Sequence, residues 1–222
     1  MARVFMAIGL TGGIASGKST VLKMFDQRAA TSSPGEKLNV EIIDADVVGH
    51  EAYAAGTSCY HSLVDHFGEK IREEDGTINR KALASIVFGD PDEMKNLQRI
   101  VWPEICTAIS DRLEQSKARA VSSAVKTIVI VEAAIMLEAK WHERLPFDLL
   151  VALVVDPNTA KERLMARNQL SAVDAEKRIG SQISNAERAA QVHAVIDNSG
   201  TQSDLELSVD NLFASRITPL LG

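Results

Sequence analysis

The sequence predicts an α/β fold in which a five-stranded parallel sheet is covered by helices on both faces. Short apolar runs alternate with helical patterns along the chain, and a glycine-rich segment joins the first run to the first helical stretch. The runs are almost continuously apolar, which is typical of strands buried on both faces of a parallel sheet. The expected strands are Val4 to Leu10, Val40 to Asp44, Thr127 to Glu132, Leu149 to Val155 and Ala194 to Asp197.

Composition limits the possible classes of protein. The 222 residues are 45% hydrophobic and 24% charged, which is enough for one α/β domain with a smaller attached lobe. The net charge of −6 argues against a general nucleic-acid binder, so an anionic substrate needs a local basic cluster. Cys59 and Cys106 lack metal-ligand spacing and form no disulfide framework, which predicts a reducing, cytoplasmic compartment. The first strand begins too early for a signal peptide, and no apolar stretch is long enough to cross a membrane.

The segment after the first strand has the pattern of a phosphate-binding loop. It is followed by a helical stretch from Thr20 to Arg28, and it reads Gly12-Gly13-Ile14-Ala15-Ser16-Gly17-Lys18-Ser19. Glycines allow positive φ, so that successive N–H groups converge on an anion beside a helix N-terminus. Lys18 is expected to contact the β- and γ-phosphates of a nucleotide, and the Ser19 hydroxyl to ligate Mg²⁺. A glycine-rich turn with an incidental Lys-Ser is the alternative, and the flanking strand and helix argue against it.

Acidic residues follow two of the expected strands. Asp44 and Asp46 lie at the carboxyl end of the second strand, the edge where open α/β sheets bind ligands. One carboxylate there could orient a hydroxyl acceptor and take its proton, while the other serves Mg²⁺ or the structure. A helix cap plus a solvated acid is the alternative. Glu132 ends the third strand, and either a Mg²⁺-linked or a structural role fits it.

A basic cluster lies within this otherwise acidic chain. Its members are Lys161, Arg163, Arg167, Lys177, Arg178 and Arg188. Arg163 and Arg167 are four residues apart, so they share one helix face and can converge on triphosphate oxygens. We interpret the segment as a lid, against the alternative of a solvated surface helix. Ser171 with Asp174 and Ser184 with Glu187 resemble capping boxes, which predict short separate helices.

The long gap between the second and third strands is almost wholly helical in pattern. A helix is expected over Asn79 to Phe88, and Asp90 should cap a new helix that starts at Pro91. Pro103 is expected to mark a kink or a second helix start. The polar residues 31–36 are expected to form a surface loop.

With these motifs the chain resembles the dephospho-CoA kinases over nearly its whole length. The matching blocks are Gly9-Leu10-Thr11-Gly12-Gly13-Ile14 with Ser16-Gly17-Lys18-Ser19, Asp44-Ala45-Asp46, Asn79-Arg80-Lys81 with Val87-Phe88, Arg163-Leu164-Met165-Ala166-Arg167, Arg178-Ile179 with Gln182, and Ile196-Asp197-Asn198-Ser199-Gly200. The resemblance implies a P-loop kinase, nucleoside-monophosphate-kinase-like three-layer fold. It divides the chain into a core of 1–46, 126–158 and 189–222, an inserted helical substrate lobe of 47–125 and a lid of 159–188.

The resemblance also implies the activity and the residues that serve it. Dephospho-CoA would be phosphorylated by ATP and Mg²⁺ at its ribose 3′-hydroxyl, by a monomer or weak homo-oligomer with no nucleic-acid or membrane partner. The implied catalytic residues are Asp46 as general base, Lys18 and Arg163. ATP would be bound by Gly12 to Thr20, Arg163, Arg167 and Asn198, and the acceptor by Asp44, Asp46, His50, Arg80 and Arg178.

Two positions depart from the bacterial pattern of the family. His50 stands where bacterial members usually carry Arg, and Trp102-Pro103 stands where they carry His-Pro. These variants, with the stretch from Glu132 to Trp141, resemble the eukaryotic-type domain found in bifunctional CoA synthase. Core packing for Trp102 and a structural hydrogen bond for His50 are the alternatives.

Two other functions compete with this one. A kinase of another nucleoside or nucleotide acceptor would share the fold and the chemistry. A nucleotide-binding switch is the second, because Asp46-Val47-Val48-Gly49 fits the DxxG pattern of GTPases. No Asn-Lys-x-Asp motif for guanine follows it, which argues against the switch.

Overall fold

The computed structural model describes residues 3–30 and 38–221, and the structural statements below concern these residues. The expected surface loop at 31–36 lies outside them. The elements in chain order are β1 (Phe5–Gly12), α1 (Lys18–Ala30), β2 (Leu38–Asp44), α2 (Ala45–Ala52), α3 (Ser58–Phe67), η1 (Glu69–Ile71), α4 (Arg80–Val87), α5 (Pro91–Ser123), β3 (Lys126–Glu132), η2 (Trp141–Glu143), β4 (Leu149–Val154), α6 (Pro157–Asn168), α7 (Ala172–Gly180), α8 (Asn185–Ala189), β5 (Ala194–Asp197), α9 (Gln202–Leu212), η3 (Phe213–Ile217) and α10 (Thr218–Leu221).

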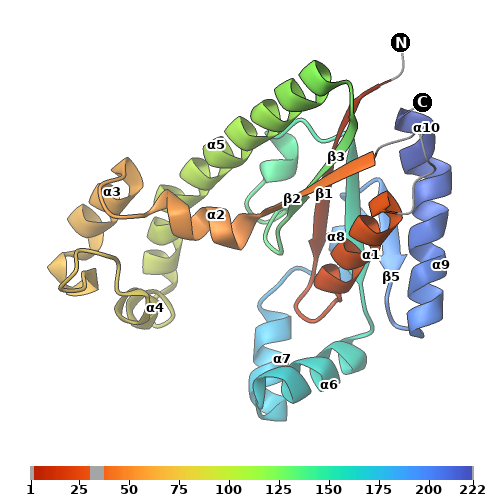
Figure 1. The fold of residues 1–222 in the computed structure, drawn as a ribbon. Coiled ribbons are helices and arrows are strands. Elements are labelled where there is room, and N and C mark those ends of the chain that lie inside the picture. Colours follow the sequence, from red (N-terminus) through yellow and green to blue (C-terminus); the bar gives the residue numbers. More distant parts are fainter. Residues whose placement is uncertain (1–2, 31–37, 222) are drawn as a thin grey trace. The chain divides into compact units, whose positions relative to one another are not determined.

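The five expected strands form one sheet in the order β2-β3-β1-β4-β5 (Figure 1). β1 lies at its centre and pairs in parallel with β3 and β4, and β4 pairs in parallel with β5. β1 runs two residues further than expected, because Gly12 still pairs with Leu153 of β4. β3 and β4 lie on opposite sides of β1 in the sheet. The loop after β1 therefore begins at the switch point where such sheets bind ligands.

The two faces of β1 are covered by different parts of the chain. Met6, Ile8 and Leu10 are buried in a core to which α1 and α9 contribute. Alternation along the strand places Ala7, Gly9 and Thr11 on the opposite face. A Cβ atom at Gly9 would lie 2.9 Å from Met136 Sδ, so the segment after β3 packs directly on that face. The phosphate-binding loop thus leaves a strand that is packed on both sides.

The chain divides into two compact units, Met1–Ile43 with Leu113–Gly222, and Asp44–Arg112. The second unit is helical. In it α2 packs closely against α5, since a Cβ atom at Gly49 would lie 3.1 Å from Ile105 Cδ1. The helix expected over Asn79 to Phe88 is present as α4, and Asn79 caps it, with its side-chain oxygen accepting the Ala82 N–H.

α5 corrects one expectation and confirms another. It begins at Pro91, where Asp90 Oδ1 accepts the Asp92 and Glu93 N–H groups. The expected second start at Pro103 is wrong, because a single helix runs through that residue to Ser123. Proline removes only one backbone hydrogen bond, and the buried side chains of Val101 and Ile105 flank it on both sides. Packing therefore overrides the local preference.

Cys59 and Cys106 are both buried, so they pack as small apolar side chains. Burial raises the pKa of the Cys59 thiol to about 11, and the Glu104 carboxylate adds to the rise. A thiol with this pKa is almost entirely protonated at neutral pH and is a weak nucleophile. In the described part of the chain, no helix is long and apolar enough to cross a membrane.

Candidate active site

The loop between β1 and α1 has the backbone of an anion cradle. Ala15 and Gly17 have positive φ values of 59° and 96°, and the Ser16 N–H donates to Gly13 O at 3.2 Å. Alternation of right- and left-handed residues turns successive N–H groups toward one point. α1 begins at Lys18, so the N-terminus of the helix adds its partial positive charge to the same concavity.

Lys18 is held at the mouth of this loop. Its Nζ donates to Gly12 O at 3.0 Å and lies 3.5 Å from Glu132 Oε1. Glu132 reaches it because β3 is the direct neighbour of β1 and both strands end at the same edge. The sequence left the role of Glu132 open, and the structure shows that its carboxylate forms an ion pair with Lys18. The arrangement keeps a partly buried ammonium next to the place where phosphate oxygens would lie.

Asn198 supports the loop from β5. Its side-chain Nδ2 donates to Ser16 O at 2.8 Å, and its backbone carbonyl oxygen accepts from Arg163 Nη2 at 3.1 Å. A cavity of about 260 Å³ opens beside these groups. Its lining residues are Ala15, Gly17, Thr20, Arg163, Asn198, Gly200, Gln202 and Leu205. The predicted nucleotide residues Gly17, Thr20, Arg163 and Asn198 are therefore brought together.

Gly17→Ala is expected to weaken ATP binding by about tenfold or more and to lower thermal stability. A Cβ atom there would lie 2.2 Å from Asn198 Nδ2, and φ at this position is one that side chains rarely adopt. Calorimetric titration with ATP and a melting curve measure the two effects. The control is Gly76→Ala, which has a similar positive φ but open space around it. A Gly17 variant that binds ATP as the wild type does would contradict the role of this tight contact.

The short helices expected in the predicted lid are present, and the capping box expected at Ser184 is complete. Ser184 and Glu187 form a full capping box at α8, and Ser171 caps α7 by accepting the Asp174 N–H. Between them, Gln182 Oε1 accepts the Ile14 N–H of the phosphate loop at 2.7 Å. A cavity of about 560 Å³ lies beside the loop. It is lined by Gly13, Ile14, Val155, Pro157, Ala160 and residues 179–180 and 182–187. The contact of Gln182 was not anticipated from the sequence, since a polar residue after a short helix gives no local signal.

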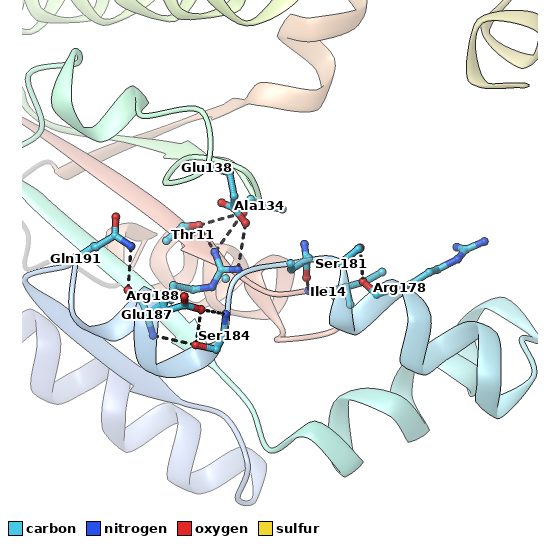
Figure 2. Close-up of polar contacts among 12 residues, drawn as sticks. Thr11, Ile14, Ala134, Glu138, Arg178, Ser181, Ser184, Glu187, Arg188 and Gln191 are labelled. Atoms are coloured by element: carbon cyan, nitrogen blue, oxygen red, sulfur yellow. Dashed lines mark hydrogen bonds and ion pairs between the residues drawn. The ribbon is translucent and has the colours of Figure 1, made fainter. Parts of the chain in front are cut away.

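The lid arginines have different surroundings. Arg163 is half-buried against Asn198, whereas Arg167 is exposed and its Nε donates to the Asn168 side chain on its own helix. Arg178 is exposed and in Figure 2 its side chain points away from Ile14. Arg188 is fully buried, which sequence reasoning did not foresee.

Four of the predicted acceptor residues, Asp44, Asp46, His50 and Arg80, lie in the second unit, whereas Arg178 belongs to the first. Asp44 Oδ1 caps α2 by accepting the Asp46 and Val47 N–H groups, and the Asp46 side chain is exposed in the first turn. His50 and Arg80 meet at Tyr53: the His50 ring centroid lies 6.2 Å from the Tyr53 centroid, and Arg80 Cζ lies 6.0 Å from it. Burial raises the pKa of Tyr53, and the Arg80 charge opposes the rise. The contact of Tyr53 with His50 and Arg80 was not anticipated from the sequence, although Tyr53 follows His50 at helical spacing.

No cluster of three or more histidine, cysteine, aspartate or glutamate side chains suited to a metal ion occurs among the described residues. Ser19 offers an exposed hydroxyl beside the phosphate loop. Mg²⁺ is commonly held by one or two protein oxygens together with phosphate oxygens and water. The residues present therefore fit a Mg²⁺ ion that arrives with a nucleotide.

Comparisons with known proteins agree with this geometry. The family model described as dephospho-CoA kinase matches residues 6–204. A dephospho-CoA kinase of Geobacter sulfurreducens is 41% identical over 209 residues, which are 94% of this chain and 98% of that protein. A crystal structure from Thermus thermophilus has a TM-score of 0.72 at 26% identity, covering 96% of this chain and 99% of the other. A dephospho-CoA kinase from Campylobacter jejuni shares the fold, with a TM-score of 0.57 at 22% identity over 96% of this chain and 97% of the other.

Proposed function

Since the chain belongs to the dephospho-CoA kinase family, we propose that it transfers the γ-phosphoryl group of ATP to the ribose 3′-hydroxyl of dephospho-CoA. The products are coenzyme A and ADP, and the reaction is the final step of coenzyme A synthesis. The observation that carries the proposal is the phosphate loop, with the Lys18 ammonium held between Gly12 O and the Glu132 carboxylate.

In the proposed mechanism the chain's own residues align and neutralise the reacting groups. The loop N–H groups bind the β-phosphate, and Lys18 stabilises the charge on the transferred group. The acceptor oxygen bonds to the γ-phosphorus as the bond to the β,γ-bridging oxygen breaks, and Asp46 takes the hydroxyl proton. Ser19 would hold Mg²⁺, which when bound neutralises charge on the β- and γ-phosphates.

We propose that three parts of the chain have different functions. Residues 1–46, 126–158 and 189–222 form the core, 47–125 the acceptor lobe and 159–188 the lid. Arg163 supports the assignment of the 260 Å³ cavity to the nucleoside of ATP, because its guanidinium is fixed there by Asn198 O. Arg167 and Arg178 would join the site when the lid closes over ATP and excludes water.

We also propose that the acceptor contacts at His50 and Trp102 are of the eukaryotic type found in bifunctional CoA synthase. The similar proteins named above are bacterial, so this likeness rests on those two positions and on the stretch from Glu132 to Trp141. Action as a monomer or weak homo-oligomer in a reducing cytoplasm belongs to the same hypothesis, and size-exclusion chromatography tests the first part.

Acceptor dependence tests the proposal. ADP release from Mg·ATP is measured with dephospho-CoA, AMP, adenosine and no acceptor, and we expect rapid release with dephospho-CoA alone. Turnover only with adenosine or AMP would support the assignment of the phosphate site but show that dephospho-CoA is not the acceptor. Release that is independent of every acceptor would overturn the kinase assignment and favour a nucleotide switch.

A further inference from the structure

Arg188 is a fully buried charge in the first unit. It lies in α8, and no other Lys, Arg, Asp or Glu side chain in the described ranges is in the buried class. Burial lowers the pKa of its guanidinium, and the Glu138 carboxylate partly opposes this change. Burying a charge costs free energy unless close partners compensate for it.

The partners of Arg188 compensate only in part (Figure 2). Nη1 donates to Thr11 Oγ1 at 3.1 Å and to Ala134 O at 3.3 Å. Nη2 lies 3.7 Å from Glu138 Oε1, and Nη2, Nε and Glu138 Oε2 have no hydrogen-bond partner among the described residues. Apolar side chains of similar volume in place of a buried ion pair are often neutral or stabilising. Packing alone therefore does not account for this charge.

The two acceptors of Nη1 connect Arg188 to Lys18. Thr11 precedes Gly12, whose carbonyl oxygen accepts from Lys18 Nζ. Ala134 follows Glu132 by two residues, and Glu132 pairs with the same ammonium. The guanidinium thus contacts both strand ends that hold Lys18, and it adds to their direct bonds, Ala133 N–H to Leu10 O at 3.0 Å and Thr11 Oγ1 to Ala134 O at 3.4 Å. It does so from α8, which the capping box of Ser184 and Glu187 fixes at the base of the lid segment.

We infer that Arg188 is a positioning residue that sets the place of the Lys18 ammonium by bridging the ends of β1 and β3. The inference rests on the proposed role of Lys18 in binding ATP. Displacement of a charged group by about 1 Å can cost a hundredfold in rate. Arg188→Met should therefore weaken ATP binding and lower kcat by about tenfold or more, with little change in the KM for dephospho-CoA.

A double-mutant cycle tests whether Arg188 acts through Lys18. ATP dissociation constants are measured by calorimetry for the wild type, Lys18→Met, Arg188→Met and the double variant. We expect the double variant to bind ATP no more weakly than Lys18→Met alone. If the losses of ATP affinity in the two single variants multiply in the double variant, the inference is overturned. An unchanged ATP affinity in Lys18→Met would instead refute the proposed function. Arg144→Met, at an exposed arginine, is the control for loss of a positive charge.

A second pair of variants separates positioning from stability. Arg188→Met with Glu138→Leu replaces the buried pair by apolar side chains and should restore the melting temperature while kcat stays low. Recovery of wild-type kcat in this pair would overturn the inference. Arg188→Lys keeps the charge without the planar bridge and is assayed alongside. It should also show reduced kcat, and full activity there would count equally against the inference.

Discussion

Asp46→Ala is expected to lower kcat by about a hundredfold or more, with only a modest change in ATP affinity. The reason is that the variant removes the group that takes the acceptor proton and leaves the phosphate loop intact. The Asp46 side chain is exposed in the first turn of α2, and Asp44 Oδ1, not Asp46, caps that helix. The fold should therefore survive the substitution.

Steady-state assays with varied dephospho-CoA and ATP measure this effect. Asp65→Ala is the matched control, because Asp65 is another exposed acid on a helix of the same unit. Its kcat should equal that of the wild type. Unchanged turnover in Asp46→Ala would refute the general-base assignment while leaving the phosphate site untouched.

Lys18→Met should impair both ATP binding and turnover, by about tenfold or more in affinity and by more in kcat. It removes the point charge that lies 3.0 Å from Gly12 O, and it leaves the Glu132 carboxylate without that partner beside the phosphates. Both consequences oppose the binding of a polyanion. The loss should exceed that of Gly17→Ala, since charge as well as shape is removed.

Calorimetric titration with ATP and a coupled ADP assay give the two quantities. Lys23→Met, at an exposed lysine of the same helix, is the control for general electrostatic attraction of ATP. A wild-type profile for Lys18→Met would contradict the interpretation of the loop. If Lys23→Met lost as much ATP affinity as Lys18→Met, the effect would be due to the net charge of the protein.

The parts of the fold that depend on local patterns were predictable from the sequence. Continuous apolar runs identified the five strands, and the loop from Gly12 to Ser19 identified the anion cradle, because its chemistry depends on adjacent residues. Cap residues such as Asp90 and Ser184 marked helix starts for the same reason.

The contacts that the sequence did not indicate join residues far apart in the chain. Arg188 reaches Thr11 across 177 positions, and Gln182 reaches Ile14 across 168. Nothing local distinguishes a buried arginine from the exposed Arg178 in the same basic cluster. The sequence did not decide between a kink and a second helix start at Pro103, and α5 runs through this residue because tertiary packing outweighs one lost hydrogen bond. Such features depend on how the strands are ordered in the sheet.

We expect this chain to phosphorylate the ribose 3′-hydroxyl of dephospho-CoA. The most direct test incubates the purified protein with Mg·ATP and dephospho-CoA, then determines the product by mass spectrometry and phosphorus NMR. We expect one phosphoryl group on the 3′-oxygen and one ADP for each product molecule. ADP formed without phosphorylated dephospho-CoA, or a phosphoryl group at another position, would contradict this expectation.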